Sequence, residues 1–128
     1  MPGQHSFNYT VIRVVPFVER QEFVNVGIIL HCKKCNFLKA RISNDLDRIK
    51  ILFPKANLIM IKNQLESIST ICRGDPEAGF FSSWSTSERF DWLASPSSTV
   101  IQTSPMHAGI CSNAETALNG LYNLMITG

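Results

Sequence analysis

The segment that most restricts the fold is residues 24–32, Val-Asn-Val-Gly-Ile-Ile-Leu-His-Cys, in which β-branched and other apolar residues dominate. This composition favours an extended strand, and its few polar positions indicate that much of both faces is buried. The run is much shorter than the roughly 20 apolar residues that span a bilayer. We therefore expect a central strand in a domain that does not enter a membrane.

Three other segments have the composition of strands. Residues 7–15 are also rich in aromatic and β-branched types, and residues 37–42 alternate between apolar and basic residues. The short link between 32 and 37 predicts a hairpin, and the link over 16–22 predicts an antiparallel meander. Residues 99–103 can form a fourth strand.

Four segments predict helices. A short one follows a cap at Asn44 or Asp45, and a longer one over 57–73 has apolar residues at the spacing of one buried stripe. Capping-box patterns open two more, at 85–88 and at 112–115. Because most strands precede the helices, we expect an α+β fold. It consists of a three- to four-stranded, mainly antiparallel sheet with helices packed on one face, in a single domain over 1–128.

Composition limits the function classes. At 128 residues and 45% hydrophobic, the chain can bury a core of its own, and its four cysteines do not resemble a disulfide framework. The first residues lack the pattern of a secretory signal, so we expect a cytoplasmic protein with reduced thiols. Phosphate-binding loops, dinucleotide fingerprints, nucleophile elbows and zinc-protease helices are absent from the sequence, and we expect no cofactor.

A basic stretch indicates a possible nucleic-acid surface. Residues 31–55 hold seven basic residues against two acidic ones. Lys39 and Arg41 are expected on an exposed strand face near Lys33 and Lys34, where they could contact phosphates. Solvated charge is the simpler explanation, since aromatic residues that would stack on bases are scarce there.

Two patterns could carry chemistry. Cys32 and Cys35 have the spacing of a zinc knuckle but supply only two ligands, so ordinary reduced thiols are the simpler interpretation. His107, in a long polar loop over 95–111, could carry protons, with Glu22, Arg89 or Ser98 as companions. The alternative is a loop histidine that bonds to backbone.

Several polar and aromatic residues could bind a ligand or a partner. Asn25 near a glycine could form a ligand-binding floor, while Arg13 and Glu22 could simply pair as ions. The candidate partner- or ligand-binding residues are Arg13, Glu22, Asn25, Arg89, Trp92, Gln102, Ser104 and His107. Arg89 has acidic neighbours that would account for it as a salt bridge, and at least one of Trp84 and Trp92 is expected in the core.

Three segments together resemble the bacterial domain of unknown function 3037 family: residues 9–13, Tyr-Thr-Val-Ile-Arg; residues 22–30, Glu-Phe-Val-Asn-Val-Gly-Ile-Ile-Leu; and residues 88–93 continuing into 97–107. The resemblance implies an accessory role beside a kinase-fold protein similar to the HipA toxins. Two features depart from the family pattern. Gln21 stands where many relatives have glycine, and the Cys32–Cys35 pair is not typical of the family.

The sequence supports three hypotheses of different classes. The leading one is a non-enzymatic accessory module that binds a protein partner, with a HipA-like kinase-fold protein as the candidate that the resemblance suggests. The others are an enzyme of unrecognised type built around His107 and a nucleic-acid binder that uses the basic 33–55 surface.

Overall fold

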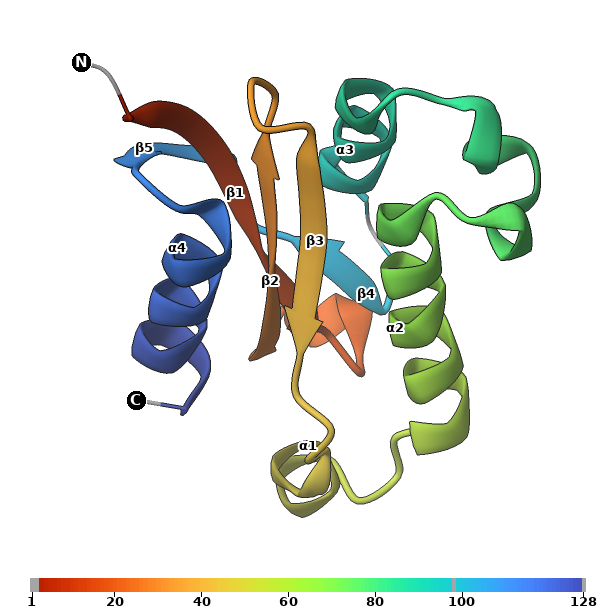
Figure 1. The fold of residues 1–128 in the computed structure, drawn as a ribbon. Helices are drawn as coiled ribbons and strands as arrows, with labels where there is room; N and C mark the ends of the chain where they lie inside the picture. Colours follow the sequence, from red (N-terminus) through yellow and green to blue (C-terminus); the bar gives the residue numbers. More distant parts are fainter. Residues whose placement is uncertain (1–2, 98, 128) are drawn as a thin grey trace.

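The sheet is assembled on β1 (His5–Val14), which is hydrogen-bonded along both edges. In the computed structural model, which describes residues 3–97 and 99–127, β2 (Val24–Cys32) pairs along one edge and β3 (Phe37–Ile42) pairs with β2. The other edge of β1 is shared by two short strands, β4 (Ile101–Thr103) and β5 (His107–Cys111). All these pairings are antiparallel (Figure 1).

The helices begin and end near the predicted signals. They are α1 (Asp47–Leu52), α2 (Leu58–Arg73), α3 (Thr86–Ala94) and α4 (Ala114–Tyr122), with 3-10 segments η1 (Val18–Arg20) and η2 (Pro76–Ser83) and a π-helical turn η3 (Asn123–Thr127). The predicted 57–73 helix and the Ser85–Glu88 capping box are confirmed. The cap of α4 is Asn113, whose side chain accepts a hydrogen bond from the N–H of Thr116, and the expected cap at Ser112 is wrong.

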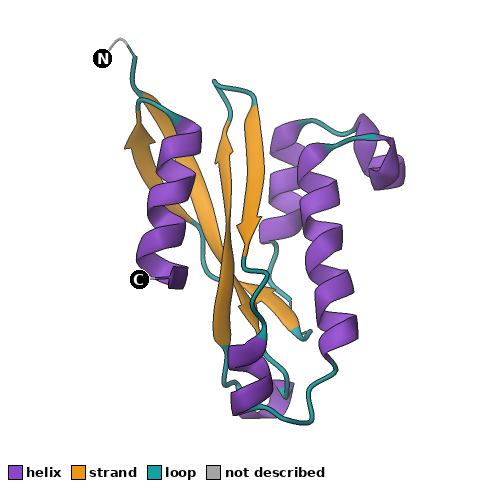
Figure 2. Ribbon diagram, turned by 60° about the horizontal axis from the view of Figure 1, so that its bottom comes forward, coloured by secondary structure: helices purple, strands orange, loops and turns teal. Residues whose placement is uncertain are grey.

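Helices cover both faces of the sheet (Figures 1 and 2). One core forms where α1, α2 and α3 pack on Ile12, Val14 and Ile29. A second core forms on the opposite face, where α4 packs on Val11 and Leu30. The α+β class and the antiparallel sheet are confirmed, but the sheet has five strands, and the expectation of helices on one face is wrong for α4. The reason is that β1 and β2 are apolar on both faces, so each face needs a cover.

A β-bulge shifts the alternation of β2. Ile12 pairs with Gly27 while Arg13 pairs with Asn25, which leaves Val26 as the extra residue. As a result, the side chains of Val24 and Val26 join the same core as Ile29. Asn25 is thereby placed beside Arg13, near the end of β1.

Ser104 joins the two short strands to β1. Its backbone N–H donates to the carbonyl oxygen of Val11 at 2.8 Å, and its Oγ accepts from the Val11 N–H at 2.8 Å. The Ser104 side chain therefore replaces a backbone partner in the interval between β4 and β5. This buried serine has a structural role, and the segment expected to be loop after residue 103 includes the strand β5.

None of the helices in the described part of the chain combines the length and the apolar character that crossing a bilayer requires.

Ser104→Ala is expected to lower the free energy of unfolding by about 1–3 kcal/mol, because the buried N–H of Val11 loses its partner. Urea denaturation monitored by circular dichroism measures the change. Ser82→Ala is the control, since the Ser82 hydroxyl is exposed and bonds only to the nearby Gly79 carbonyl. Equal stability of the two variants would contradict the role assigned to Ser104.

Candidate functional site: a groove beside Trp92

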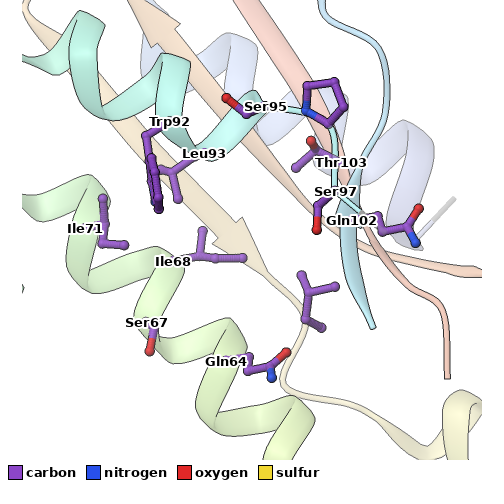
Figure 3. Close-up of a pocket in the computed structure, with 12 residues that line it drawn as sticks. Gln64, Ser67, Ile68, Ile71, Trp92, Leu93, Ser95, Ser97, Gln102 and Thr103 are labelled. Carbon is purple, nitrogen blue, oxygen red and sulfur yellow. The ribbon is translucent and has the colours of Figure 1, made fainter. Parts of the chain in front are cut away.

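A groove of about 450 Å³ runs between α2, α3 and β4. Figure 3 shows Ile68 and Ile71 of α2 on one wall, with Trp92 and Leu93 of α3 beside them. The opposite rim is formed by Ser95, Pro96 and Ser97 and by the three residues of β4. The groove therefore combines an apolar wall with a polar rim, as ligand- and peptide-binding sites do.

Trp92 belongs to a cluster of four aromatic residues beside this groove. The ring centroids of Trp92 and Phe81 are 5.6 Å apart, and Trp84 meets Trp92 edge-to-face at 6.2 Å. Phe80 stacks on Phe81 at 4.3 Å. Trp92 remains 55% exposed and Phe80 67% exposed. The cluster is an apolar surface held in place by its own packing, and it lies outside the two cores.

Arg89 fixes α3 against the end of α2. Its Nη1 donates to the carbonyl oxygens of Ile71 at 2.8 Å and Cys72 at 2.7 Å, and its Nε donates to the carbonyl oxygen of Trp84 at 3.2 Å. The guanidinium thus satisfies the last carbonyl groups of α2, where the helix dipole favours a cation. Arg89 does not form the expected salt bridge. Its donors cap the end of α2 instead.

Gly74 makes this arrangement possible. It ends α2 with a left-handed φ of 65°. A Cβ at this position would lie 2.4 Å from Nη1 of Arg89. A residue with a side chain would therefore displace the guanidinium that positions α3.

A second group of candidate binding residues lies at the end of the sheet, where β1 finishes. Arg13 pairs with Asn25 of β2 on one side and with Gln102 of β4 on the other. The Arg13 guanidinium lies over the ring of Phe23, 4.3 Å from its centroid. Glu22 is exposed and forms no ion pair with Arg13, so the expected pairing is wrong. The glycine near Asn25, Gly27, accommodates β3: a Cβ there would lie 2.7 Å from the carbonyl oxygen of Arg41.

His107 is placed at the start of β5. It is exposed, pairs with Tyr9 and stacks on the Tyr9 ring at a centroid distance of 5.3 Å. Neither Glu22 nor any other described carboxylate forms an ion pair with His107. Arg89, the second companion considered, donates to the carbonyl groups at the end of α2, and Ser98, the third, lies outside the described residues. The arrangement around His107 is that of a strand residue stacked on its neighbour.

Two of the basic residues contact α4. Lys39 pairs with Glu115 at 2.7 Å, and Arg41 lies over the ring of Tyr122 and donates to Asn119. The expected exposure is confirmed for Lys39, whose side chain is 53% exposed, but it is wrong for Arg41, which is half-buried against α4. Lys33 and Lys34 are exposed at the hairpin tip.

The two cysteines of the hairpin form a thiol pair. The sulfur atoms of Cys32 and Cys35 are 2.7 Å apart and share a hydrogen bond. That bond, with a smaller contribution from burial, raises the pKa of the Cys35 thiol to about 11. His31 points to the other face, where it stacks on Phe90 and bonds to Thr86. Within residues 3–97 and 99–127, no three His, Cys, Asp or Glu side chains gather as metal ligands.

The fold is thus an antiparallel sheet between two helical layers, with a groove between α2, α3 and β4. The family model described as "protein of unknown function (DUF3037)" matches residues 9–126. The chain belongs to this family, as the three resembling segments predicted. No curated protein and no solved structure matches the chain.

Arg89→Gln is expected to lower the free energy of unfolding by about 3 kcal/mol, because bonds from a charged donor to buried carbonyl groups are lost. Arg73→Gln is the matched control at the same helix end. Its exposed ion pairs with Asp75 and Glu77 are worth at most about 1 kcal/mol. Chemical denaturation compares the two, and equal losses would contradict the capping role of Arg89.

Alkylation of Cys35 by iodoacetamide is expected to be slow at pH 8, since the thiolate is the nucleophile and a raised pKa keeps the thiol protonated. The rate should rise as the pH approaches 11. Cys32→Ala removes the hydrogen bond and should accelerate the reaction at pH 8, whereas Cys32→Ser retains a bonding group and should accelerate it less. Peptide mass mapping measures the modification at Cys35, and equal rates in both variants would contradict the effect of the bond.

Proposed function

We propose that this protein is a non-enzymatic module that binds an extended segment of a partner protein in the groove beside Trp92. The observation that carries the proposal is the half-exposed Trp92, held edge-to-face on Trp84 at the lip of a 450 Å³ groove. Tryptophan is enriched among the residues that dominate binding energy at protein interfaces. A tryptophan held in place before binding also loses little side-chain entropy when a partner covers it.

The groove suits an extended segment of a partner. Ile68, Ile71 and Leu93 offer apolar contacts along the wall, while Ser95 and Gln64 can bond to backbone groups at the rims. Apolar pockets with a few polar groups at the rim are typical of such sites. Phe80 extends the apolar surface beyond the groove and gives a partner additional area to cover.

The two alternative functions have less support. His107 is exposed and does not line the groove, and Lys39 and Arg41 contact α4. A HipA-like kinase-fold protein is the first full-length partner to test, because the family resemblance suggested it. Binding to such a protein would place the module in an accessory role.

The test is selection of a random peptide library on the immobilised protein, with counter-selection on the Trp92→Gln variant. Enriched peptides are then synthesised, and their dissociation constants are measured by fluorescence anisotropy. Trp92→Gln is expected to weaken binding by about 30-fold or more, because truncating a central interface tryptophan costs about 2 kcal/mol or more. A HipA-like protein should compete with the peptides.

Ile59→Gln is the matched control, because Ile59 is 77% exposed on α2 and does not line the groove. Its dissociation constants should stay within about twofold of wild type. Thermal denaturation checks that both variants are folded. Equal binding to Trp92→Gln and wild type, or the absence of enriched peptides, would overturn the proposal. Sedimentation of the protein alone shows whether a second copy occupies the groove instead.

A further inference from the structure

The guanidinium of Arg13 is not paired in the described structure. Its Nε is buried and has no hydrogen-bond partner among residues 3–97 and 99–127, and no ion pair in this part of the chain includes Arg13. One face of the guanidinium is covered by the Phe23 ring at 4.3 Å. The stacking occupies one flat face of the group and leaves the terminal Nη donors, which lie in its plane, available to a ligand.

An unpaired buried donor on a charged group is unusual, because removing such a group from water costs free energy unless a partner replaces the water. Arg89 in the same molecule shows the common solution, since its guanidinium donates to three carbonyl oxygens. Arg13 has no comparable partners in residues 3–97 and 99–127. The guanidinium of Arg13 is only partly buried, so its terminal N–H groups can reach a partner from outside the described chain.

The cavity at Arg13 has the chemistry of a carboxylate site. It has a volume of about 350 Å³, and Arg13 is the only charged residue among the described residues that line it. Gln21, Ser97 and Gln102 supply neutral polar groups, and Phe23 with two valines supplies apolar walls. A single guanidinium matches one carboxylate, which it can bind through two parallel hydrogen bonds.

Gln21 is held in an unusual conformation at this cavity. Its φ of 58° is left-handed, a region that costs a residue with a side chain about 1–2 kcal/mol relative to the right-handed one. This is the position at which many relatives were expected to have glycine. The glutamine places an amide at the cavity wall that a glycine would lack.

The cavity and the Trp92 groove are neighbours. Ser97 and Gln102 line both of them, so the two hollows adjoin around the β4 edge. The side chain of Gln102 is held in place where its Nε2 donates to the Thr99 carbonyl oxygen at 2.9 Å. In Figure 3, Gln102 lies on the far side of the groove from Trp92. A segment that lies in the groove can therefore extend a group past Gln102 towards Arg13.

We propose that the partner segment carries a carboxylate, which binds Arg13 while adjacent apolar residues of the same segment occupy the Trp92 groove. This inference rests on the proposed function, and it specifies the chemistry of the segment that occupies the groove. Arg13 supplies the charge, Gln21 and Gln102 supply amide groups, and Phe23 keeps the guanidinium oriented. An acidic side chain or a chain-terminal carboxylate next to large apolar residues fits both hollows.

The test is a nuclear magnetic resonance titration of the ¹⁵N-labelled protein with N-acetyl-leucyl-leucine and with its carboxamide. The Nε–Hε signal of Arg13 and the indole N–H signal of Trp92 report the two hollows separately. We expect the acid to shift both signals with one dissociation constant, and the carboxamide to shift only the signal of Trp92. Arg13→Gln should weaken binding of the acid by about tenfold or more and leave binding of the carboxamide unchanged.

Arg20→Gln is the matched control, since Arg20 also stacks on a phenylalanine, Phe17, but does not line the cavity. It should bind both probes as wild type does. If the acid and the carboxamide bind with equal affinity and the Arg13 signal does not move, the proposed contact between Arg13 and a carboxylate is excluded. Binding of a segment in the Trp92 groove is not excluded by that result. A shift of Arg13 without Trp92 would show a separate site for free carboxylates and overturn the shared segment. No shift of either signal would overturn the inference, while the peptide selection tests the groove by itself.

Discussion

The ladder between β1 and β2, with its bulge at Val26, is the constraint on which the other layers depend. Both strands are apolar on both faces, so one helical layer cannot shield them from water and α4 must cover the second face. The bulge then changes which residues of β2 share a face. It places Asn25 next to Arg13 at the end of the sheet. The bulge therefore determines both which residues of β2 enter the core and which residue of β2 lies beside Arg13.

The groove depends on a second constraint, the buried guanidinium of Arg89. It ties the start of α3 to the last carbonyl groups of α2 and so sets the spacing of the groove walls. A charged side chain in this position is favourable because the carbonyl ends of a helix carry partial negative charge. Gly74 leaves the space that the guanidinium occupies. The exposed Trp92 is carried on the helix that Arg89 positions.

Much of the fold followed from local pattern, and the errors have identifiable causes. The strands over 24–32 and 37–42 and the helix over 57–73 were predicted because periodicity and capping act over a few residues. β5 was missed because its composition, His-Ala-Gly-Ile-Cys, has little strand preference, and its pairing with β1 determines its conformation. Of the aromatic cluster, Trp84 and Trp92 were singled out, whereas Phe80 and Phe81 lie in an irregular segment without a periodic signal.

The sequence by itself determined the α+β class, the main strands and helices and the family, because each depends on the order and local spacing of residue types. Only the tertiary structure decided that Arg13 and Gln102 meet, that Arg89 caps a helix and that Lys39 and Arg41 contact α4. These contacts join residues far apart in the chain. Their energies depend on distance and burial in three dimensions, which no local pattern records.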